Sequence, residues 1–485
     1  MESPSPYWWP RFLFQRGLGL VYLIAFLVAV NQFRPLLGER GLLPVPFFVR
    51  HVPFRRAPSL FYWFPTDAAF AAAAWAGVVL ACLALTGISE RYQRWFSALV
   101  WALLWVLYLS FVNVGQSFYA FGWESMLLEA GFYAIFLGNR ASAPGAIGMW
   151  LLRWMLFRVM FGAGMIKLRG DPCWTRFTCL DWHFETQPMP NPLSWYFHFL
   201  PRWTHHAGVG FNHFIELAVP FGYFAPQPVA MAAGLLTMFF QVILMLSGNL
   251  SFLNLLTIVI AMATLDGRVL ARWLPRPAPR PTSPDWRYAS LSLAAVVAAL
   301  SIQPALNLLS SEQVMNYSYN PLHLVNSYGA FGGVNRTRFE VIVEGTADAV
   351  TTPSTRWLAY EFKGKPGDPR RRPPQIAPYH LRLDWEMWFA AMSDYQSEPW
   401  FIRFVVKLLE GDRATLGLLA SNPFPRRPPR RVRAVLYRYR FATPNERRRT
   451  GAWWVRVPVG PWFPEVSLNT PGLREFGAGT ARGSP

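Results

Sequence analysis

The chain has 485 residues, of which 53% are hydrophobic and only 15% carry a charge. About a quarter of the residues are charged in a typical soluble protein, so the composition excludes an ordinary soluble globular protein. The formal net charge of +19 comes without a nucleic-acid-binding motif, because the densest basic runs lie among prolines or in loops. We therefore expect a basic surface beside anionic membrane lipid and no nucleic-acid partner.

Long apolar runs fill the first part of the chain, and residues 1–304 are predicted to form a multi-pass α-helical membrane domain. Arg11 and Arg16 precede the first run as in a signal peptide. No small-residue cleavage site follows, which predicts a retained helix. A straight span needs about 20 apolar residues and several candidates are shorter, so we expect about eight spans, to within about two. The candidates are Gly17–Val30, Ala68–Ile88, Phe96–Val114, Ser125–Leu137, Trp150–Lys167, Phe211–Phe224, Val229–Leu246, Phe252–Leu265 and Tyr288–Ile302.

A loop of residues 167–208, rich in charged and thiol side chains, follows the predicted span Trp150–Lys167. Its residues 171–190 read DPCWTRFTCLDWHFETQPMP. Charged side chains are costly to place at a bilayer boundary without a function. This loop is therefore the first place to look for a functional site.

The pattern changes after Pro304, and residues 305–467 are predicted to form a soluble β-rich domain, either β-sandwich-like or α+β. Between the membrane domain and this region, Arg272–Pro284 is a proline-rich linker, and residues 468–485 are expected to be a disordered tail. Alternation of apolar and polar residues predicts strands at Phe339–Glu344, Trp357–Phe362 and Val432–Phe441, and helices are predicted at Asp384–Met392 and Trp400–Leu409.

Five segments together carry a family resemblance. They are Asn113–Phe132, Phe157–His198, Asn320–Thr346, Arg371–Ala391 and Arg433–Phe441, and they resemble the lipase maturation factors. The resemblance implies a membrane protein that helps secreted lipases reach their folded, active assembly and that is linked to redox handling. Animal members lie in the endoplasmic reticulum membrane, and their carboxyl-terminal domain faces the lumen. The resemblance implies no defined enzymatic chemistry.

A shorter resemblance covers only Phe161–Trp174, which reads FGAGMIKLRGDPCW. It is similar to a stretch of the vitamin-K-dependent γ-carboxylases and their bacterial membrane relatives. In that family the lysine that corresponds to Lys167 is the base-forming residue. From its sequence position alone, Lys167 either extends to the lipid headgroups or lies in the bundle near a carboxylate such as Glu124 or Glu129. Only the second arrangement, with a lowered pKa, suits a base.

Cys173 and Cys179 are the only plausible cysteine pair, because Cys82 lies inside an apolar segment. Their spacing differs from the CxxC of thioredoxin-type sites. A disulfide is possible if the loop folds back and brings the two Cα atoms within about 7 Å. Three alternatives stay open: a structural disulfide, a redox-active pair that exchanges with client cysteines, and two unrelated thiols.

Glu124 and Glu129 lie in an otherwise apolar predicted helix, about 140° apart around its axis. An unpaired carboxylate in hydrocarbon costs at least ~2.5 kcal/mol, so each glutamate is expected to have a partner. Arg153 and Arg158 on the next apolar segment are the natural candidates. A buried structural ion pair and a contact with substrate are the two interpretations.

Asp181, His183 and Glu185 alternate along the chain, and on an extended strand their side chains would point to one side. A metal site is one interpretation, and hydrogen-bonded anchors of the loop are the other.

The sequence contains no G-x-S-x-G, P-loop or dinucleotide-binding motif and implies no cofactor, which argues against the enzyme classes that these motifs mark. Two functions remain open. The favoured one is a folding or assembly factor for secreted lipases or other exported proteins, with the β-rich domain and the loop Cys173–Pro190 facing the client. The alternative is a membrane-embedded γ-carboxylase-like enzyme with Lys167 as the base and a lipid-soluble or peptide substrate. We expect an integral membrane protein, in the endoplasmic reticulum of a eukaryote or in the cytoplasmic membrane of a bacterium.

Overall fold

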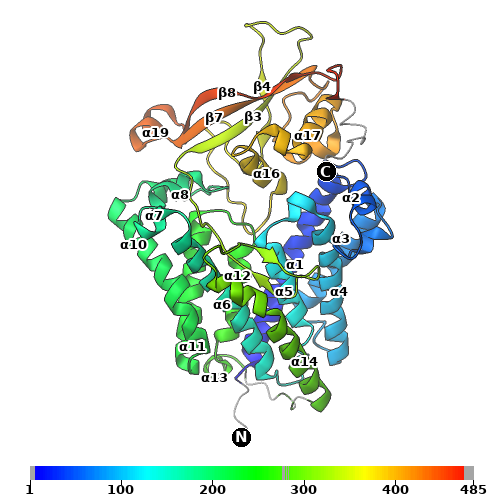
Figure 1. Cartoon of the computed structure of the whole chain (residues 1–485), viewed down its shortest axis with the longest axis vertical. Coiled ribbons are helices and arrows are strands. Elements are labelled where there is room, and N and C mark those ends of the chain that lie inside the picture. Colours follow the sequence, from blue (N-terminus) through cyan, green and yellow to red (C-terminus); the bar gives the residue numbers. More distant parts are fainter. Residues whose placement is uncertain (1–5, 276–278, 280, 282, 474–485) are drawn as a thin grey trace.

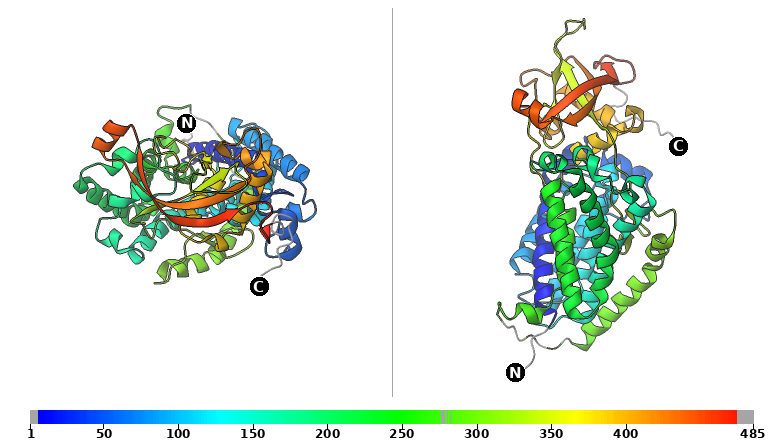
Figure 2. Two further views of the ribbon diagram at one scale, coloured as in Figure 1. Left: turned by 90° about the horizontal axis from the view of Figure 1, so that it is seen from above. Right: turned by 90° about the vertical axis from the view of Figure 1, so that its left-hand side faces the viewer.

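The computed structural model describes residues 6–275, 279, 281 and 283–473. A bundle of helices forms one end of the molecule, and a β-sheet with its own helices forms the other (Figure 1). The beginning of helix α1 lies at the end of the bundle that is far from the sheet (Figures 1 and 2). The predicted order of a multi-pass bundle followed by a β-rich region is confirmed.

Six helical segments among the described residues are long and apolar enough to cross a membrane. They are rich in residues with high helix propensity, and their ends carry the expected breakers, such as the left-handed Gly87 after Thr86. The six segments are α1 (Trp8–Leu37), α3 (Asp67–Thr86), α4 (Arg94–Val114), α6 (Ala146–Arg169), α11 (Gln227–Ser247) and the run Pro284–Leu309, which comprises α14 (Pro284–Leu300) and α15 (Ile302–Leu309).

The described part of the structure has six segments long enough to span a membrane, where about eight were expected to within about two. The difference arises because three of the predicted spans are too short to cross a membrane. Segment Ser125–Leu137 becomes α5 (Gly122–Ala134), whose side chains are almost all buried by other helices. Segment Phe252–Leu265 becomes α12 (Leu253–Ala261) with the single turn η5 (Met262–Thr264). Segment Phe211–Phe224 is broken into the end of α10 (Arg202–His213), a π-helical turn (Phe214–Ala218) and a 3-10 turn (Val219–Phe224). Helices α5 and α12 are apolar because neighbouring helices cover them, and composition does not distinguish that from contact with lipid.

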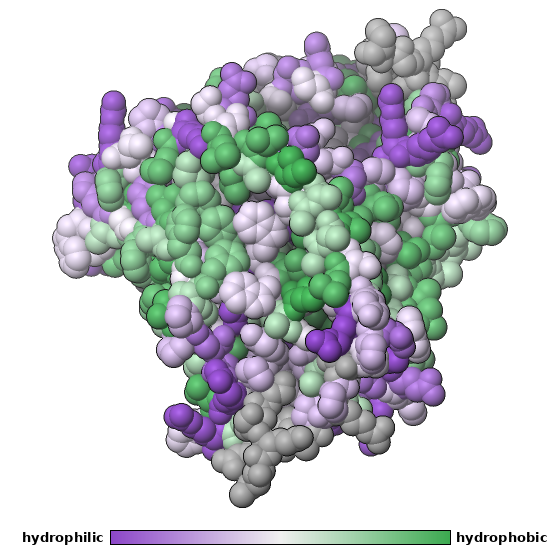
Figure 3. Space-filling view, turned by 60° about the horizontal axis from the view of Figure 1, so that its bottom comes forward, coloured by the Kyte–Doolittle hydropathy of each residue, from purple (hydrophilic) through white to green (hydrophobic). Residues whose placement is uncertain are grey.

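The spanning helices present their apolar side chains outward. Trp75, Val79, Leu99 and Phe239 are all more than half exposed although they lie on α3, α4 and α11. Figure 3 shows apolar side chains gathered over the helices of the bundle, with hydrophilic side chains around them. An exposed apolar surface of this extent is stable only in contact with lipid. The protein is therefore an integral membrane protein.

The carboxyl-terminal part is of the α+β kind. Its main sheet is antiparallel, with strand order β4-β3-β7-β8, and β3 and β7 pair over nine consecutive residues. Helices α16 (Arg382–Ala390) and α17 (Pro399–Glu410) lie between the sheet and the bundle (Figure 1). Strand β8 was not predicted, because Pro458, Pro461 and Pro464 interrupt its pattern, and proline is tolerated at the edge of a sheet. The strands are β1 (Tyr317–Ser318), β2 (Asn326–Ser327), β3 (Arg338–Thr346), β4 (Leu358–Ala359), β5 (Glu361–Phe362), β6 (Leu419–Ser421), β7 (Arg431–Phe441) and β8 (Trp454–Val466).

Shorter helices connect these parts. The amphipathic helix α17 buries Phe401, Phe404 and Leu408 against the sheet, as its apolar spacing requires. Of the predicted tail, residues 468–473 are ordered and residues 474–485 lie outside the described residues, as does part of the predicted linker Arg272–Pro284. The short helices are α2 (Val45–His51), η1 (Leu60–Tyr62), η2 (Gln116–Tyr119), α7 (Pro172–Thr175), α8 (Leu180–Thr186), α9 (Ser194–His198), α10 (Arg202–His213), η3 (Phe214–Ala218), η4 (Val219–Phe224), α13 (Gly267–Leu270), α16 (Arg382–Ala390), η6 (Tyr395–Ser397), α17 (Pro399–Glu410), α18 (Arg413–Leu416) and α19 (Pro444–Thr450).

Candidate functional site

The loop that follows helix α6 is closed by a disulfide between Cys173 and Cys179, whose Cα atoms lie 4.8 Å apart. The two cysteines are 2% and 0% exposed and pack against Val209 and Val334. The backbone folds back between them, and the Thr178 amide donates to the Cys173 carbonyl at 2.8 Å. Neither sulfur is accessible to a client cysteine, so this geometry fits a structural disulfide better than a site of exchange.

The same loop is fastened to the segment that leads into strand β3. The Arg336 guanidinium lies 2.7 Å from the Asp171 carboxylate and stacks 4.3 Å from the ring of Trp182. The Asp171 amide donates to the Gly332 carbonyl at 2.8 Å. Gly170 permits this approach, because a Cβ there would lie 2.2 Å from the same carbonyl oxygen. The hydrogen bond from Arg336 is the main reason that the pKa of Asp171 lies below its usual range.

The cluster of Asp181, His183 and Glu185 lies on helix α8 and not on an extended strand. A helix turns by about 100° per residue, so the ring of His183 points away from Asp181 and Glu185, which lie about 40° apart on the other side of the helix. Asp181 contacts His205 at 2.9 Å, and Glu185 accepts a hydrogen bond from the Phe441 amide at 2.7 Å. Within the described part of the chain, no group of three or more His, Cys, Asp and Glu side chains is placed to hold a metal ion. The two acids, Asp181 and Glu185, anchor the loop, in line with the second interpretation of the pattern.

Lys167 is buried inside the bundle, and its partner is Glu216 rather than Glu124 or Glu129. The ammonium donates to both carboxylate oxygens of Glu216 at 2.6 Å, and Asn212 donates to the same carboxylate at 2.8 Å. Glu216 lies in the π-helical turn η3, and a π-turn inside a helix often marks a special site. An acidic residue within the apolar run Phe211–Phe224 was the sequence signal for this partner.

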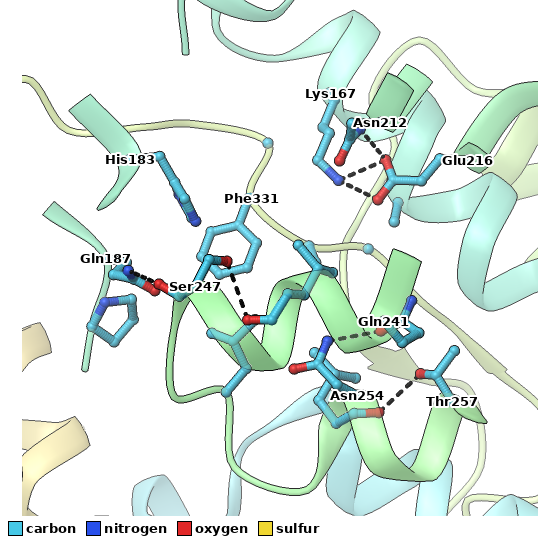
Figure 4. A pocket seen from close by; sticks show the side chains of 18 of the residues that line it. Lys167, His183, Gln187, Asn212, Glu216, Gln241, Ser247, Asn254, Thr257 and Phe331 are labelled. Carbon is cyan, nitrogen blue, oxygen red and sulfur yellow. Dashed lines mark hydrogen bonds and ion pairs between the residues drawn. The ribbon is translucent and has the colours of Figure 1, made fainter. Parts of the chain in front are cut away.

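A cavity of about 540 Å³ lies between helices α6, α11 and α12, and its lining includes Lys167, Glu216 and His183. Figure 4 shows the Lys167–Glu216 pair with Asn212 at one corner, and Gln241, Asn254 and Thr257 at another. Burial is the main reason that the pKa of His183 falls to about 4, and the charge of Lys167 adds to it. The ring of His183 is therefore neutral near pH 7.

Glu129 and Arg158 form a fully buried ion pair between α5 and α6, in which Arg158 donates to both carboxylate oxygens. Tyr133 and Tyr328 each donate to the carboxylate at 2.7 Å, and the Asn326 amide donates at 3.1 Å. Tyr328 and Asn326 come from the segment beyond the bundle. The pair thus joins two helices of the bundle to the chain that leads into the sheet.

Glu124 pairs with Arg382, a residue that the sequence interpretation had not connected to it. The closest atoms of the two side chains lie 2.8 Å apart, and both are fully buried. Tyr108 of helix α4 also donates to this carboxylate, and Gln32 of α1 accepts from the Arg382 amide at 3.0 Å. Arg153 lies elsewhere in the bundle, and it donates to the carbonyl oxygens of Ala263 and Tyr223 and to Gln227.

Comparison with known proteins identifies the architecture. The profile of the lipase maturation factor transmembrane domain matches residues 9–272, and the profile of the lipase maturation factor C-terminal domain matches residues 324–464. The chain belongs to the lipase maturation factor family. It is 44% identical to lipase maturation factor 1 of Bos taurus over 95% of this chain and 89% of that protein, and 44% identical to lipase maturation factor 1 of Homo sapiens over 95% and 88%. It is 30% identical to lipase maturation factor 2 of Homo sapiens over 96% and 84%. No solved structure matches the chain.

In this member of the lipase maturation factor family, two further residues hold the two parts together, and the sequence interpretation missed both. Arg338 of strand β3 is buried, pairs with Glu340 at 2.6 Å and donates to three backbone carbonyls of the disulfide-bearing loop. Asn249, at the end of α11, accepts hydrogen bonds from Gln375 and from the backbone amides of Ile376 and Ala377. Nothing in the sequence around Arg338 or Asn249 indicates their partners in the other part of the molecule, because these partners lie far away along the chain.

Proposed function

We propose that the chain is a membrane-bound folding or assembly factor for exported proteins, with secreted lipases as the client class. The observation that carries this proposal is the match of both parts of the chain to lipase maturation factors over 95% of its length. The names of these relatives state a role in lipase maturation, and 44% identity over nearly the whole chain favours the same role here.

The disulfide indicates the side of the membrane on which this work is done. Structural disulfides persist in oxidising compartments and are rare in the cytosol. The loop with Cys173 and Cys179 lies at the same end of the bundle as the sheet (Figure 1). We infer that the sheet faces the oxidising side, which is the lumen of the endoplasmic reticulum in a eukaryote or the periplasmic face in a bacterium. Folding exported proteins pass through both of these compartments.

The client-facing surface is assigned to the sheet rather than to the disulfide-bearing loop. Most of the loop Cys173–Pro190 is buried, and only residues 175–177 are exposed. Strand β8 is an edge strand, and its Val457 and Val459 are 48% and 56% exposed. Exposed apolar side chains on a sheet edge are a common docking site for an extended segment of another chain.

A reconstitution experiment tests the function. The full chain is expressed with a secreted lipase in cells that lack their own lipase maturation factor, and lipase activity is measured per amount of secreted lipase. We expect this specific activity to rise well above that of cells with an empty vector. An unchanged specific activity with normal expression of the chain counts against the role.

The client surface is tested by the double variant Val457→Lys, Val459→Lys. We expect it to recover less lipase in a pull-down and to support less lipase activity, because lysine disfavours edge pairing. Val350→Lys is the matched control, since Val350 is 76% exposed in the loop between β3 and β4. Equal loss in both variants would place the client elsewhere.

The alternative of a γ-carboxylase-like enzyme with Lys167 as base has no observation in its favour. A base needs an unpaired amine, and both carboxylate oxygens of Glu216 accept from this ammonium.

A further inference from the structure

The cavity beside Lys167 has the properties of a binding site and not of a packing defect. Its volume of about 540 Å³ lies within the range of about 300–1,000 Å³ that is usual for small-molecule sites. Most of its lining is apolar and aromatic, with a few polar groups that converge on it. A protein interior rarely leaves a void of this size, since close packing stabilises the fold.

Two residues that line this cavity have a buried polar atom without a hydrogen-bond partner among the described residues: Trp123 at Nε1, a donor, and Asn254 at Oδ1, an acceptor. Asn254 of helix α12 is 2% exposed and donates from Nδ2 to Gln241 at 2.7 Å. Its Oδ1 is buried and accepts no hydrogen bond within the described residues. An unsatisfied buried carbonyl costs about 1–3 kcal/mol, and a ligand that donates a hydrogen bond removes that penalty. His183, across the cavity, also has no hydrogen bond from its ring nitrogens to the described residues.

The charge of the cavity excludes an anionic ligand. Lys167 is its one buried cation among the described lining residues, and Glu216 neutralises it through two contacts of 2.6 Å. Asn212 adds a further donor to the same carboxylate. A carboxylate or phosphate ligand would have to displace this ion pair in a buried place, which is unfavourable.

The mouth of the cavity suits a molecule that arrives from the membrane. Leu200, Met315 and Phe389 line the cavity and are also 44%, 42% and 40% exposed. The cavity therefore opens at an apolar rim where the bundle meets the carboxyl-terminal part. Its walls include the spanning helices α6 and α11. A single hydrocarbon chain fits this apolar entrance better than a peptide, whose backbone amides would need partners.

We propose that this cavity binds a neutral single-chain lipid with a hydroxyl head group, such as a monoacylglycerol, and that the hydroxyl donates to Oδ1 of Asn254. The chain of the lipid packs against the aromatic lining of the cavity. This site does not depend on the proposed role in lipase maturation.

The experiment uses the purified full chain in lipid nanodiscs with photoactivatable probes that share one acyl chain. The first probe is a monoacylglycerol, the second is the same molecule with both hydroxyls methylated, and the third is the fatty acid. We expect the monoacylglycerol probe to label peptides from α6, α11 or α12 and to be displaced by unlabelled monooleoylglycerol. Labelling outside the lining segments, or preference for the fatty acid, overturns the proposal.

Two variants separate cavity binding from surface binding. Ala163→Phe fills the cavity one turn before Lys167, and Ala232→Phe makes the same change on the exposed face of α11. We expect Ala163→Phe to lower capture by about tenfold or more, because the phenyl ring takes the space of the chain, and Ala232→Phe to leave it unchanged. Equal capture by the two variants overturns the proposal.

Asn254→Leu tests the head group. We expect it to lower capture of the hydroxyl probe by about three- to tenfold and to leave capture of the methylated probe unchanged, because only the first donates a hydrogen bond. Equal losses for both probes contradict the assigned contact.

Organic extraction of the wild-type protein tests the site without any variant. After purification from native membranes, a neutral single-chain lipid should be enriched in the extract over the bulk lipid. Its absence from the extract speaks against the site.

Discussion

Arg382, the first residue of helix α16, places its guanidinium 2.8 Å from the carboxylate of Glu124 in the first turn of helix α5. Both side chains are fully buried, and the ring of Tyr119 lies 3.4 Å from the guanidinium carbon. The contact joins the carboxyl-terminal part to a helix that is itself surrounded by the spanning helices. The two parts of the chain therefore form one folded unit rather than a bundle with a tethered domain.

We expect Arg382→Met to lower the stability of the whole protein by about 3–5 kcal/mol, because it leaves the Glu124 carboxylate buried without its cation. Thermal unfolding in detergent measures the loss. Arg440→Met is the matched control: its pair with Glu446 is exposed, and such pairs contribute about 0–1 kcal/mol. The double variant Glu124→Leu, Arg382→Met should recover most of the stability, and a double variant as unstable as the single one would contradict this account.

Glu129→Gln should destabilise the junction between the bundle and the segment that leads into the sheet. The substitution keeps the size of the side chain, but it leaves Arg158 buried without a counter-charge, which costs about 3–5 kcal/mol. Limited proteolysis should then cut the segment around Asn326 and Tyr328 faster than in the wild type. Glu344→Gln, whose pair with Arg433 is partly exposed, is the control and should be cut at the wild-type rate. Unchanged protection in Glu129→Gln would refute the proposed coupling.

Replacing both Cys173 and Cys179 with serine should lower stability by about 2 kcal/mol, as expected for a short disulfide loop. If the disulfide is structural, the variant should still support lipase maturation at a reduced temperature. Loss of maturation in a variant that is folded would instead favour redox exchange with the client. Alkylation of the unfolded protein before reduction should modify only Cys82, and alkylation of the unfolded protein after reduction should modify all three cysteines.

Lys167→Met should destabilise the bundle by about 3–5 kcal/mol, since it leaves the Glu216 carboxylate buried and unpaired. The double variant Lys167→Met, Glu216→Met should be close to the wild type in thermal stability. If Lys167 serves only in this pair, the double variant also supports lipase maturation. A stable double variant that has lost all function would show that the amine itself acts in chemistry.

Stability should fall as the pH drops from about 6.5 to about 4. Burial, with a smaller contribution from Lys167, lowers the pKa of His183 from 6.5 to about 4 in the folded state. Above pH 6.5 the ring is neutral in both states; between pH 6.5 and 4 the unfolded state takes up a proton that the folded state does not, so stability is lost. For one histidine, the free energy of unfolding falls by about 3 kcal/mol over this pH range.

His183→Gln should weaken the fall in unfolding temperature between pH 7 and pH 4.5. His198, His323 and His380, whose pKa values burial also lowers to about 4, contribute to the part that remains. His206→Gln is the control, because its side chain is exposed, and it should reproduce the wild-type pH profile. A His183→Gln profile identical to that of the wild type would mean that this ring is solvated in the folded protein.

Local pattern was enough to predict much of the fold. The strands that form β3 and β7 and the helices α16 and α17 were predicted within a few residues, because the alternation of β-strands and the apolar stripe of helices are periodic features of the sequence. The number of spans was less well predicted, since α5 and α12 are apolar through burial by protein and not by lipid. Strand β8 was missed because its prolines mask a pattern that an edge strand tolerates.

The residues of the candidate site were also predicted only in part from the sequence. The sequence alone determined that Lys167, Glu124, Glu129 and the two cysteines lie where charge and thiols are unusual, and that a large part of the chain is dissolved in lipid. Only the tertiary structure decided that Lys167 pairs with Glu216, 49 residues further on, and that Glu124 pairs with Arg382 from the other end of the chain. The reason is physical: the transfer of a side chain from water to lipid depends on that residue and its neighbours, whereas the partner of a buried charge depends on which distant helices pack together.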